Sequence, residues 1–193
     1  MKEPILYRIT RPIIKALFRI LYKPTYIGLE NIPQTGKVVL SGNHTNNFDC
    51  LLLISSTKRT IHFLAKDSLT KGIKKIIFNN FGIIPVNRKI HDKQALNNAI
   101  NYLNNNQVIG IFPEGTINRT NDIIMPFKIG SIKMSHDTNS PIVPFIITGK
   151  YKLLKKSITI EFLPSYIPKN DNLTKENEKL MNIISDKLKE KKE

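Results

Sequence analysis

The chain has 193 residues, 40% of them apolar, and carries 30 Lys and Arg against 15 Asp and Glu, a formal net charge of +15. This length suits a single domain, and the charge predicts attraction to polyanions, either nucleic acid or an anionic membrane. One cysteine excludes a disulfide framework and a cysteine-rich zinc cluster. The few aromatic residues do not interleave with the basic ones, which argues against a nucleic-acid partner.

Residues 4–22 predict an amphipathic helix, either continuous or in two pieces around Pro12. Basic residues recur at four-residue spacing beside an apolar face, the basic set being Arg11, Lys15, Arg19 and Lys23 and the apolar set Ile9, Ile13, Leu17, Ile20 and Leu21. Such a helix either lies on a membrane surface or packs on the core with a solvated basic face. The apolar stretch is shorter than the roughly 20 residues of a membrane span, and the charged start does not resemble a signal peptide.

Further along the chain, short apolar runs alternate with helical patterns. Strands are expected at residues 26–30, 38–40, 60–65, 83–86, 108–112, 142–148 and 157–163. Helices are expected at 49–56, 68–79, 92–104, 128–135 and 175–191, with Asp92 as an N-cap. This alternation predicts an α/β fold with a mainly parallel central sheet flanked by helices. In such sheets, functional sites lie in the loops beyond the strand ends.

The segment Asn43-His44-Thr45-Asn46-Asn47-Phe48-Asp49 directly follows a predicted buried strand. In a tight turn, the Asp49 carboxylate can hold one ring nitrogen of His44 and leave the other free to accept a proton. This pair would be a general base with its orienting group and needs no serine or cysteine nucleophile. A His and an Asp also share polar turns by chance, because both are common turn residues.

Three further segments follow in order: Phe81-Gly82-Ile83-Ile84-Pro85-Val86-Asn87-Arg88, Ile111-Phe112-Pro113-Glu114-Gly115-Thr116-Ile117-Asn118-Arg119, and Ser140-Pro141-Ile142-Val143-Pro144-Phe145. With the His44 segment, they resemble the four blocks of the glycerolipid acyltransferases, and in particular the 1-acyl-sn-glycerol-3-phosphate (lysophosphatidic acid) acyltransferase family. The resemblance spans roughly residues 25 to 165, and the order and spacing of the blocks make it specific.

The resemblance implies a glycerolipid-acyltransferase-like fold and a fatty acyl transfer from acyl-CoA or acyl-carrier protein to the sn-2 hydroxyl of lysophosphatidic acid, giving phosphatidic acid. We therefore divide the chain into a membrane-surface helix at residues 1–23 and an acyltransferase domain at 24–193. The expected partners are the lysophospholipid, the acyl donor and an anionic membrane surface, with no metal or bound cofactor. The expected location is peripheral, on the cytoplasmic face of the cell membrane.

The resemblance also implies roles for individual residues. His44 would be the base and Asp49 its orienting partner. Arg88 follows a short strand, where its guanidinium can pair with a phosphate. The resemblance assigns the acceptor head group to Glu114, Gly115 and Thr116. It places Pro144 on the acyl-donor side, and Lys66 is a further candidate phosphate contact.

Three positions depart from the family pattern, one of them being Asp67, which follows Lys66 where the family often has Glu. The family commonly has Ser where Asn46 stands and often Arg where Ile117 stands. The loss of an Arg beside the phosphate site puts the head-group preference in doubt, and Arg119 and Lys128 are the residues that can compensate.

Other functions stay open from the sequence. Cys50 follows Asp49 and invites a nucleophile hypothesis, although a small buried residue opening an apolar helix explains it more simply. The acceptor can be another lysolipid, or water, which would make the protein a thioesterase. A non-catalytic basic module that binds anionic lipid or nucleic acid is the alternative from a different class, and it would have no use for a base.

Overall fold

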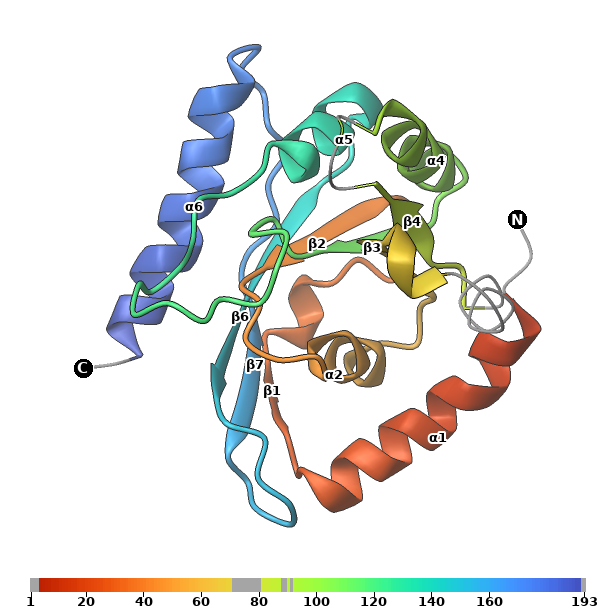
Figure 1. The fold of residues 1–193 in the computed structure, drawn as a ribbon, viewed down its shortest axis with the longest axis vertical. Helices are drawn as coiled ribbons and strands as arrows, with labels where there is room; N and C mark the ends of the chain where they lie inside the picture. The colour runs from red at the N-terminus through yellow and green to blue at the C-terminus, as the bar shows by residue number, and fades with distance from the viewer. Residues whose placement is uncertain (1–3, 71–80, 88–89, 91, 192–193) are drawn as a thin grey trace.

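The protein, described by a computed structural model over residues 4–70, 81–87, 90 and 92–191, is built on a seven-stranded sheet with helices on both faces (Figure 1). Across the sheet, the strands are β1 (Thr25–Ile27), β7 (Ile158–Phe162), β6 (Ile142–Gly149), β2 (Val38–Gly42), β5 (Val108–Ile111), β3 (Ile61–Lys66) and β4 (Ile84–Val86). Within the described residues, β6 and β7 pair antiparallel and the other neighbours pair parallel. The predicted α/β fold with a mainly parallel sheet is confirmed.

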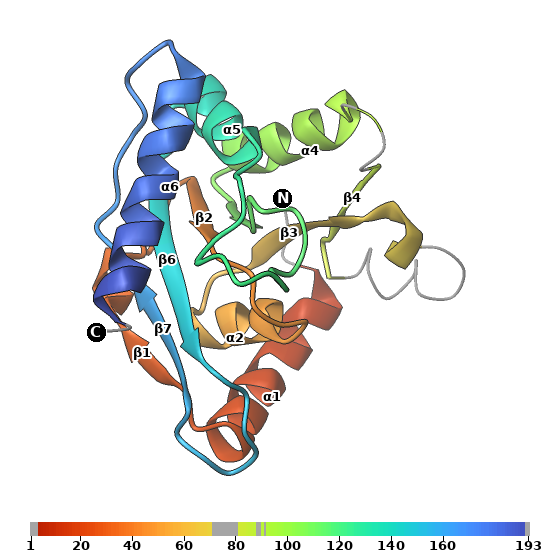
Figure 2. The same cartoon turned by 60° about the vertical axis from the view of Figure 1, so that its left-hand side comes forward.

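The sheet separates two hydrophobic cores. Helices α1 (Ile5–Leu21) and α2 (Asp49–Ser56) cover one face, and α4 (Lys93–Asn104), α5 (Gly130–Thr138) and α6 (Leu173–Glu190) cover the other (Figures 1 and 2). Side chains of β2 alternate between them: Val38 and Leu40 join the first core, and Val39 joins the second. A strand buried on both faces sends apolar side chains into both cores, which is why the sequence shows a continuous apolar run at 38–40.

Local chemistry sets several helix ends, and the N-cap predicted at Asp92 is confirmed. The Asp92 carboxylate accepts from the amide of Ala95 at 2.9 Å and caps α4. Asn172 caps α6 in the same way, accepting from the amide of Lys175 at 3.2 Å. At the other end of α5, Asn139 takes the left-handed conformation (φ 50°) that ends many helices.

The structure shortens one predicted element, decides between the two alternatives for a second and describes only part of a third. The strand expected at 26–30 ends at Ile27, because Gly28 has a positive φ of 70° and turns the chain into a short 3₁₀ helix. Helix α1 is continuous through Pro12, with Tyr7 and Phe18 anchoring it in the core on either side. Of the helix expected at 68–79, the structure describes a 3₁₀ turn over Asp67–Thr70, and residues 71–79 lie outside the described part.

Candidate active site

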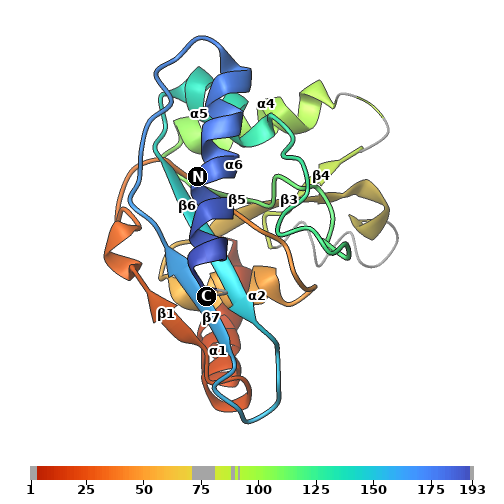
Figure 3. The ribbon, with the colours of Figure 1, turned by 90° about the vertical axis from the view of Figure 1, so that its left-hand side faces the viewer.

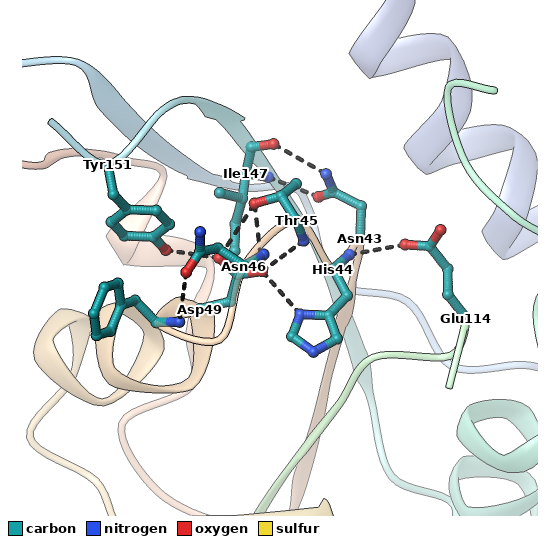
Figure 4. A network of polar contacts seen from close by, with 9 residues as sticks. Asn43, His44, Thr45, Asn46, Asp49, Glu114, Ile147 and Tyr151 are labelled. Atoms are coloured by element: carbon teal, nitrogen blue, oxygen red, sulfur yellow. Dashed lines mark hydrogen bonds and ion pairs between the residues drawn. The ribbon is translucent and has the colours of Figure 1, made fainter. Parts of the chain in front are cut away.

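A polar loop of residues 43–48, the His44 loop, connects β2 to α2 beyond the carboxyl end of the sheet's central strand (Figure 4). All five residues of β2 are buried, and the strand is paired on both edges, to β5 and β6. The start of the loop is therefore fixed by the sheet. The loop beyond a strand end in a parallel sheet is the usual place for a functional site.

The predicted pair of His44 and Asp49 is formed. Nδ1 of His44 lies 2.9 Å from Oδ2 of Asp49, and the same oxygen accepts from the amides of Thr45 and Asn46 at 2.6 and 2.8 Å. Asp49 is fully buried in the first turn of α2, where a helix stabilises a negative charge. An ionised carboxylate only accepts hydrogen bonds, so Nδ1 carries the proton and Nε2 is left as the proton acceptor. The side chain of His44 keeps 16% of its surface exposed, which gives a substrate access to it.

An aromatic ring fixes the plane of the imidazole. Phe112, the residue after β5, stacks on His44 with a centroid distance of 4.1 Å and an interplanar angle of 16°. The stack and the bond to Asp49 together define both the plane of the ring and its rotation in that plane. The base is therefore held in one orientation before any substrate binds.

Glu114 holds the backbone of the same loop. Its Oε1 accepts from the amide of His44 at 2.8 Å (Figure 4). Its Oε2 accepts from the amide of Met125, also at 2.8 Å. Burial raises the pKa of Glu114, and the two amide bonds act in the opposite direction. With both oxygens used by amides, the structure gives Glu114 a supporting role. The head-group contact expected for it stays a prediction.

Asn43 is a site residue that sequence reasoning did not assign. Its side-chain amide donates to the carbonyl of Ile147 at 3.0 Å, and its carbonyl oxygen accepts from the amide of Ile147 at 2.7 Å. On the other side, the amide of Asn118 donates to the carbonyl of His44 at 2.9 Å. These bonds tie the His44 loop to β6 and to the loop after β5. The sequence signal was present, because a buried amide directly after an apolar strand needs partners.

Tyr151 is a second residue that sequence reasoning missed. Its hydroxyl donates to Oδ1 of Asp49 at 2.7 Å, across 102 positions of sequence. Its ring meets Phe18, Tyr22 and Phe48 with centroid distances of 6.4, 5.6 and 5.7 Å. Burial and the nearby carboxylate raise the pKa of Tyr151, which keeps the phenol protonated as a donor. No local pattern marks this residue, since it lies between β6 and β7.

The thiol of Cys50 is a poor nucleophile. Burial, with the Asp49 carboxylate adding to it, raises the pKa of Cys50 to about 12. The thiolate is the reactive form, so little of it is present near neutral pH. This supports the simpler interpretation of Cys50 as a packing residue.

The remaining predicted residues fall in four groups. Gly115 lies directly under the Lys128 side chain, because a Cβ at Gly115 would come within 2.9 Å of the Lys128 Nζ. Three others are exposed on loops and strand ends around the site, namely Lys66, Thr116 and Arg119. Pro144 is buried within β6 opposite Ser41. Its position on the acyl-donor side stays a prediction. Arg88 lies outside the described residues.

A cavity of about 640 Å³ opens beside the site. Phe112, Gly115 and Lys128 form part of its wall, so the ring that is stacked on His44 also lines the cavity. The rest of the wall comes mainly from β4, α4 and α5 and is mostly apolar, with Lys93, Lys133 and Asp92 as charged residues. This arrangement suits a ligand with an apolar body and an anionic group.

The other histidines and the potential metal ligands of the described residues lie apart from this site or in structural positions. No group of three His, Cys, Asp or Glu side chains in the described part is placed to hold a metal ion. His62 is buried and bonded to the carbonyl of Gly82 at 2.8 Å, and His136 lies at the surface near Asp137 and Asp171. His91 lies outside the described residues. Among the helices described, none is long and apolar enough to cross a membrane.

A histidine held by a buried carboxylate, in a loop beyond the end of a parallel strand, has the geometry of a general base. Residues 23–148 match the acyltransferase family model, and the chain belongs to this family. The family assignment made from the four sequence blocks is confirmed.

Among individual relatives, the chain is 37% identical over 134 residues to the 1-acyl-sn-glycerol-3-phosphate acyltransferase of Borreliella burgdorferi, covering 68% of this chain and 53% of that protein. It is 28% identical over 127 residues to the enzyme of the same name from Bacillus subtilis, covering 62% and 60%. The chain thus spans little more than half the length of these relatives. Its fold is similar to that of the 1-acyl-sn-glycerophosphate (LPA) acyltransferase PlsC from Thermotoga maritima, with a TM-score of 0.78 and 19% identity over 96% of this chain and 81% of that one.

Proposed function

We propose that this protein transfers a fatty acyl group from acyl-CoA or acyl-carrier protein to the sn-2 hydroxyl of lysophosphatidic acid, giving phosphatidic acid for phospholipid synthesis. The observation that carries the proposal is the His44–Asp49 pair, with Nδ1 bonded at 2.9 Å and Nε2 left as the acceptor. The names of the relatives from B. burgdorferi and B. subtilis support this choice of acceptor.

The reaction follows from the geometry of the pair. Nε2 of His44 takes the proton of the acceptor hydroxyl while that oxygen attacks the thioester carbonyl. The tetrahedral intermediate then expels the thiolate of the donor, which takes the proton back from His44. Asp49 holds the ring tautomer and stabilises the imidazolium that forms between the two transfers. General-base assistance of this kind is worth about 10²–10⁴ in rate, and the steps as proposed use no metal ion or bound cofactor.

The cavity beside Phe112 suits the lipid. Its apolar walls can take an acyl chain, while Lys128, which lies against Gly115, lines the same cavity as Phe112, the residue stacked on His44. We assign the acceptor phosphate to the basic side chains of Lys66, Arg119 and Lys128, with Gly115 and Thr116 in the turn after β5, and by the sequence resemblance to Arg88, which lies outside the described residues. A lysine or arginine pairs with phosphate through charge-assisted hydrogen bonds.

We place the protein peripherally on the cytoplasmic face of the membrane, and helix α1 supports the peripheral position. Its outward face carries five exposed apolar side chains, Ile5, Ile9, Ile13, Leu17 and Ile20, between 48% and 67% exposed. Beside this apolar stripe, Arg11, Lys15 and Arg19 lie close enough for burial and their like charges to lower the pKa of Lys15. An anionic surface would relieve this repulsion, so the helix fits the membrane interface better than a solvated position.

One assay distinguishes this function from its rivals. Purified protein is offered labelled acyl-CoA and acyl-carrier protein against a panel of lysolipids, with water as the only acceptor in a parallel reaction. Labelled phosphatidic acid, formed fastest from lysophosphatidic acid, supports the proposal. Free fatty acid as the main product would indicate a thioesterase, and a different preferred lysolipid would correct the acceptor. No product with any acceptor, in protein that still binds anionic vesicles, would favour a non-catalytic module.

A further inference from the structure

The loop of residues 150–156 that joins β6 to β7, the hairpin loop, exposes two large apolar side chains. Leu153 and Leu154 are 63% and 60% exposed, as much as the most exposed residues of α1. The loop reads Lys150-Tyr151-Lys152-Leu153-Leu154-Lys155-Lys156, so four lysines and no acidic residue surround the leucines. Adjacent exposed leucines in a small protein need an explanation, because folding alone does not require them there.

The hairpin loop lies against the C-terminal end of α1. The amide of Leu154 donates to the carbonyl of Leu21, the last residue of the helix. Both views of the ribbon place the hairpin at the same end of the molecule as this helix end (Figures 1 and 3). The two exposed leucines therefore lie next to the end of the helix that carries the exposed apolar stripe, on a different element of the chain.

We propose that the hairpin loop is a second lipid contact, at which Leu153 and Leu154 enter the interface of an anionic bilayer while the four lysines bind its head groups. The inference rests on the proposed function, which places the acceptor in a membrane. Charge complementarity carries it, since both α1 and the loop are basic and free of acidic residues within residues 5–21 and 150–156. The exposed apolar side chains of α1 and of the adjoining hairpin loop suit contact with one extended surface, such as a bilayer.

A bilayer fits this surface better than the other occupants. A second copy of the chain would bring a basic face against a basic face, which repulsion opposes. An acidic protein, such as the carrier of the acyl group, would pair with the lysines and leave the leucines without a role. A bilayer interface uses both, because anionic head groups overlie an apolar interior.

Tyr151 connects the hairpin loop to the candidate active site. The residue lies in the hairpin loop two positions before Leu153, and its hydroxyl donates to Asp49 at 2.7 Å. A loop anchored in the bilayer would thus hold the donor that supports the catalytic carboxylate. The same anchor would bring the His44 loop close to the surface from which the acceptor comes.

The test uses the absence of tryptophan from the chain. In the full-length protein, Leu153→Trp places one fluorescent reporter at the hairpin loop, and Ile167→Trp places a control at an exposed apolar position of a separate loop (37% exposed). Vesicles of phosphatidylglycerol and phosphatidylcholine should shift the emission of the first variant to shorter wavelength and leave the second unchanged. An unshifted Leu153→Trp spectrum, in protein that floats with the vesicles, would overturn the proposal.

Vesicle-binding measurements on variants that lack the leucines or lysines of the hairpin loop test the same contact. Leu153→Asn combined with Leu154→Asn should weaken vesicle binding about tenfold through lost apolar burial, and Asn tolerates the left-handed backbone of Leu154 (φ 59°). Lys152→Gln and Lys155→Gln should each weaken binding about fivefold at low salt. The control, Ile167→Asn, should bind as the parent does.

Unchanged vesicle binding in the leucine variant, with binding to acyl-carrier protein lost instead, would assign the surface to a protein partner. These readouts measure lipid contact and not turnover. The acyl-transfer proposal can therefore fail while the hairpin contact holds, and the reverse is equally visible.

Discussion

His44 and His62 have similar local surroundings in two regions of the molecule. His44 stacks on Phe112 at 4.1 Å, and His62, within β3, stacks on Tyr102 at 3.9 Å. Each uses Nδ1 in a short hydrogen bond, of 2.9 Å for His44 and 2.8 Å for His62. A stacked ring with an ordered Nδ1 therefore does not by itself identify a base.

The two sites differ in the partner of Nδ1 and in access. The partner of His44 is the carboxylate of Asp49, which can stabilise an imidazolium, whereas the partner of His62 is the neutral carbonyl of Gly82. His62 is 3% exposed and is also bonded by the side chain of Gln107, and burial lowers the pKa of His62. The carboxylate and the accessible second nitrogen, together, separate a general base from a structural histidine.

The largest expected effect comes from removing the base. His44→Ala should lower kcat by about 10²–10⁴, because the acceptor hydroxyl then loses its proton acceptor. The fold should persist, since the loop keeps the contacts of Asn43 and the backbone bonds of His44. Initial rates with a saturating donor, beside a thermal melt, measure this. Near-normal turnover by the purified variant would rule out the mechanism.

Asp49→Asn should reduce kcat by about 10²–10⁴ with little change in KM. The NH2 group of Asn can donate a hydrogen bond to Nδ1, which favours the ring tautomer with its proton on Nε2, and that tautomer cannot accept the substrate proton. This change converts the surroundings of His44 into the neutral type that His62 has. Steady-state kinetics on both substrates give the split between kcat and KM. A variant that loses affinity for the acceptor but keeps kcat would show that Asp49 acts in binding.

Tyr151→Phe should lower kcat about tenfold and leave both KM values unchanged, because Asp49 loses a donor at 2.7 Å while the aromatic packing remains. The matched control is Tyr26→Phe, which loses a hydroxyl bond to Ser55 of 2.6 Å away from the carboxylate. Both variants should melt at similar temperatures. Equal activity in the two would mean that Tyr151 contributes packing alone.

His62→Phe should have the smallest effect on activity, with kcat within about twofold of the parent. The ring stack is kept, but the Gly82 carbonyl loses its donor, which should cost about 1–3 kcal/mol of unfolding free energy. Because the pKa of His62 is lowered in the folded state, protonation favours unfolding as the pH falls below about 6.5. The free energy of unfolding, measured with urea at pH values below about 6.5, should fall less steeply with pH in the variant than in the parent. An unchanged pH dependence would contradict the assignment of His62 as a buried structural histidine.

The candidate site shows where local chemistry is sufficient and where it is not. The His44–Asp49 pair could be predicted, because five positions of polar turn after a buried strand bring the two side chains together. Gly115 and Lys128 could be named from the motif, but their contact depends on how the loop after β5 returns to α5. Glu114 could be named, yet its bonds to the amides of His44 and Met125 could not, because they join separate loops.

By itself, the sequence determined the alternation of strands and helices, the N-cap at Asp92 and the spacing of the base and its carboxylate. These depend on side-chain periodicity and on hydrogen bonds between near neighbours, which short segments specify. Only the tertiary structure decided that Tyr151 supports Asp49, that Phe112 fixes the imidazole and that the hairpin loop meets the end of α1. Such contacts join residues from different strands and helices, and packing of the whole chain around the sheet sets their distances.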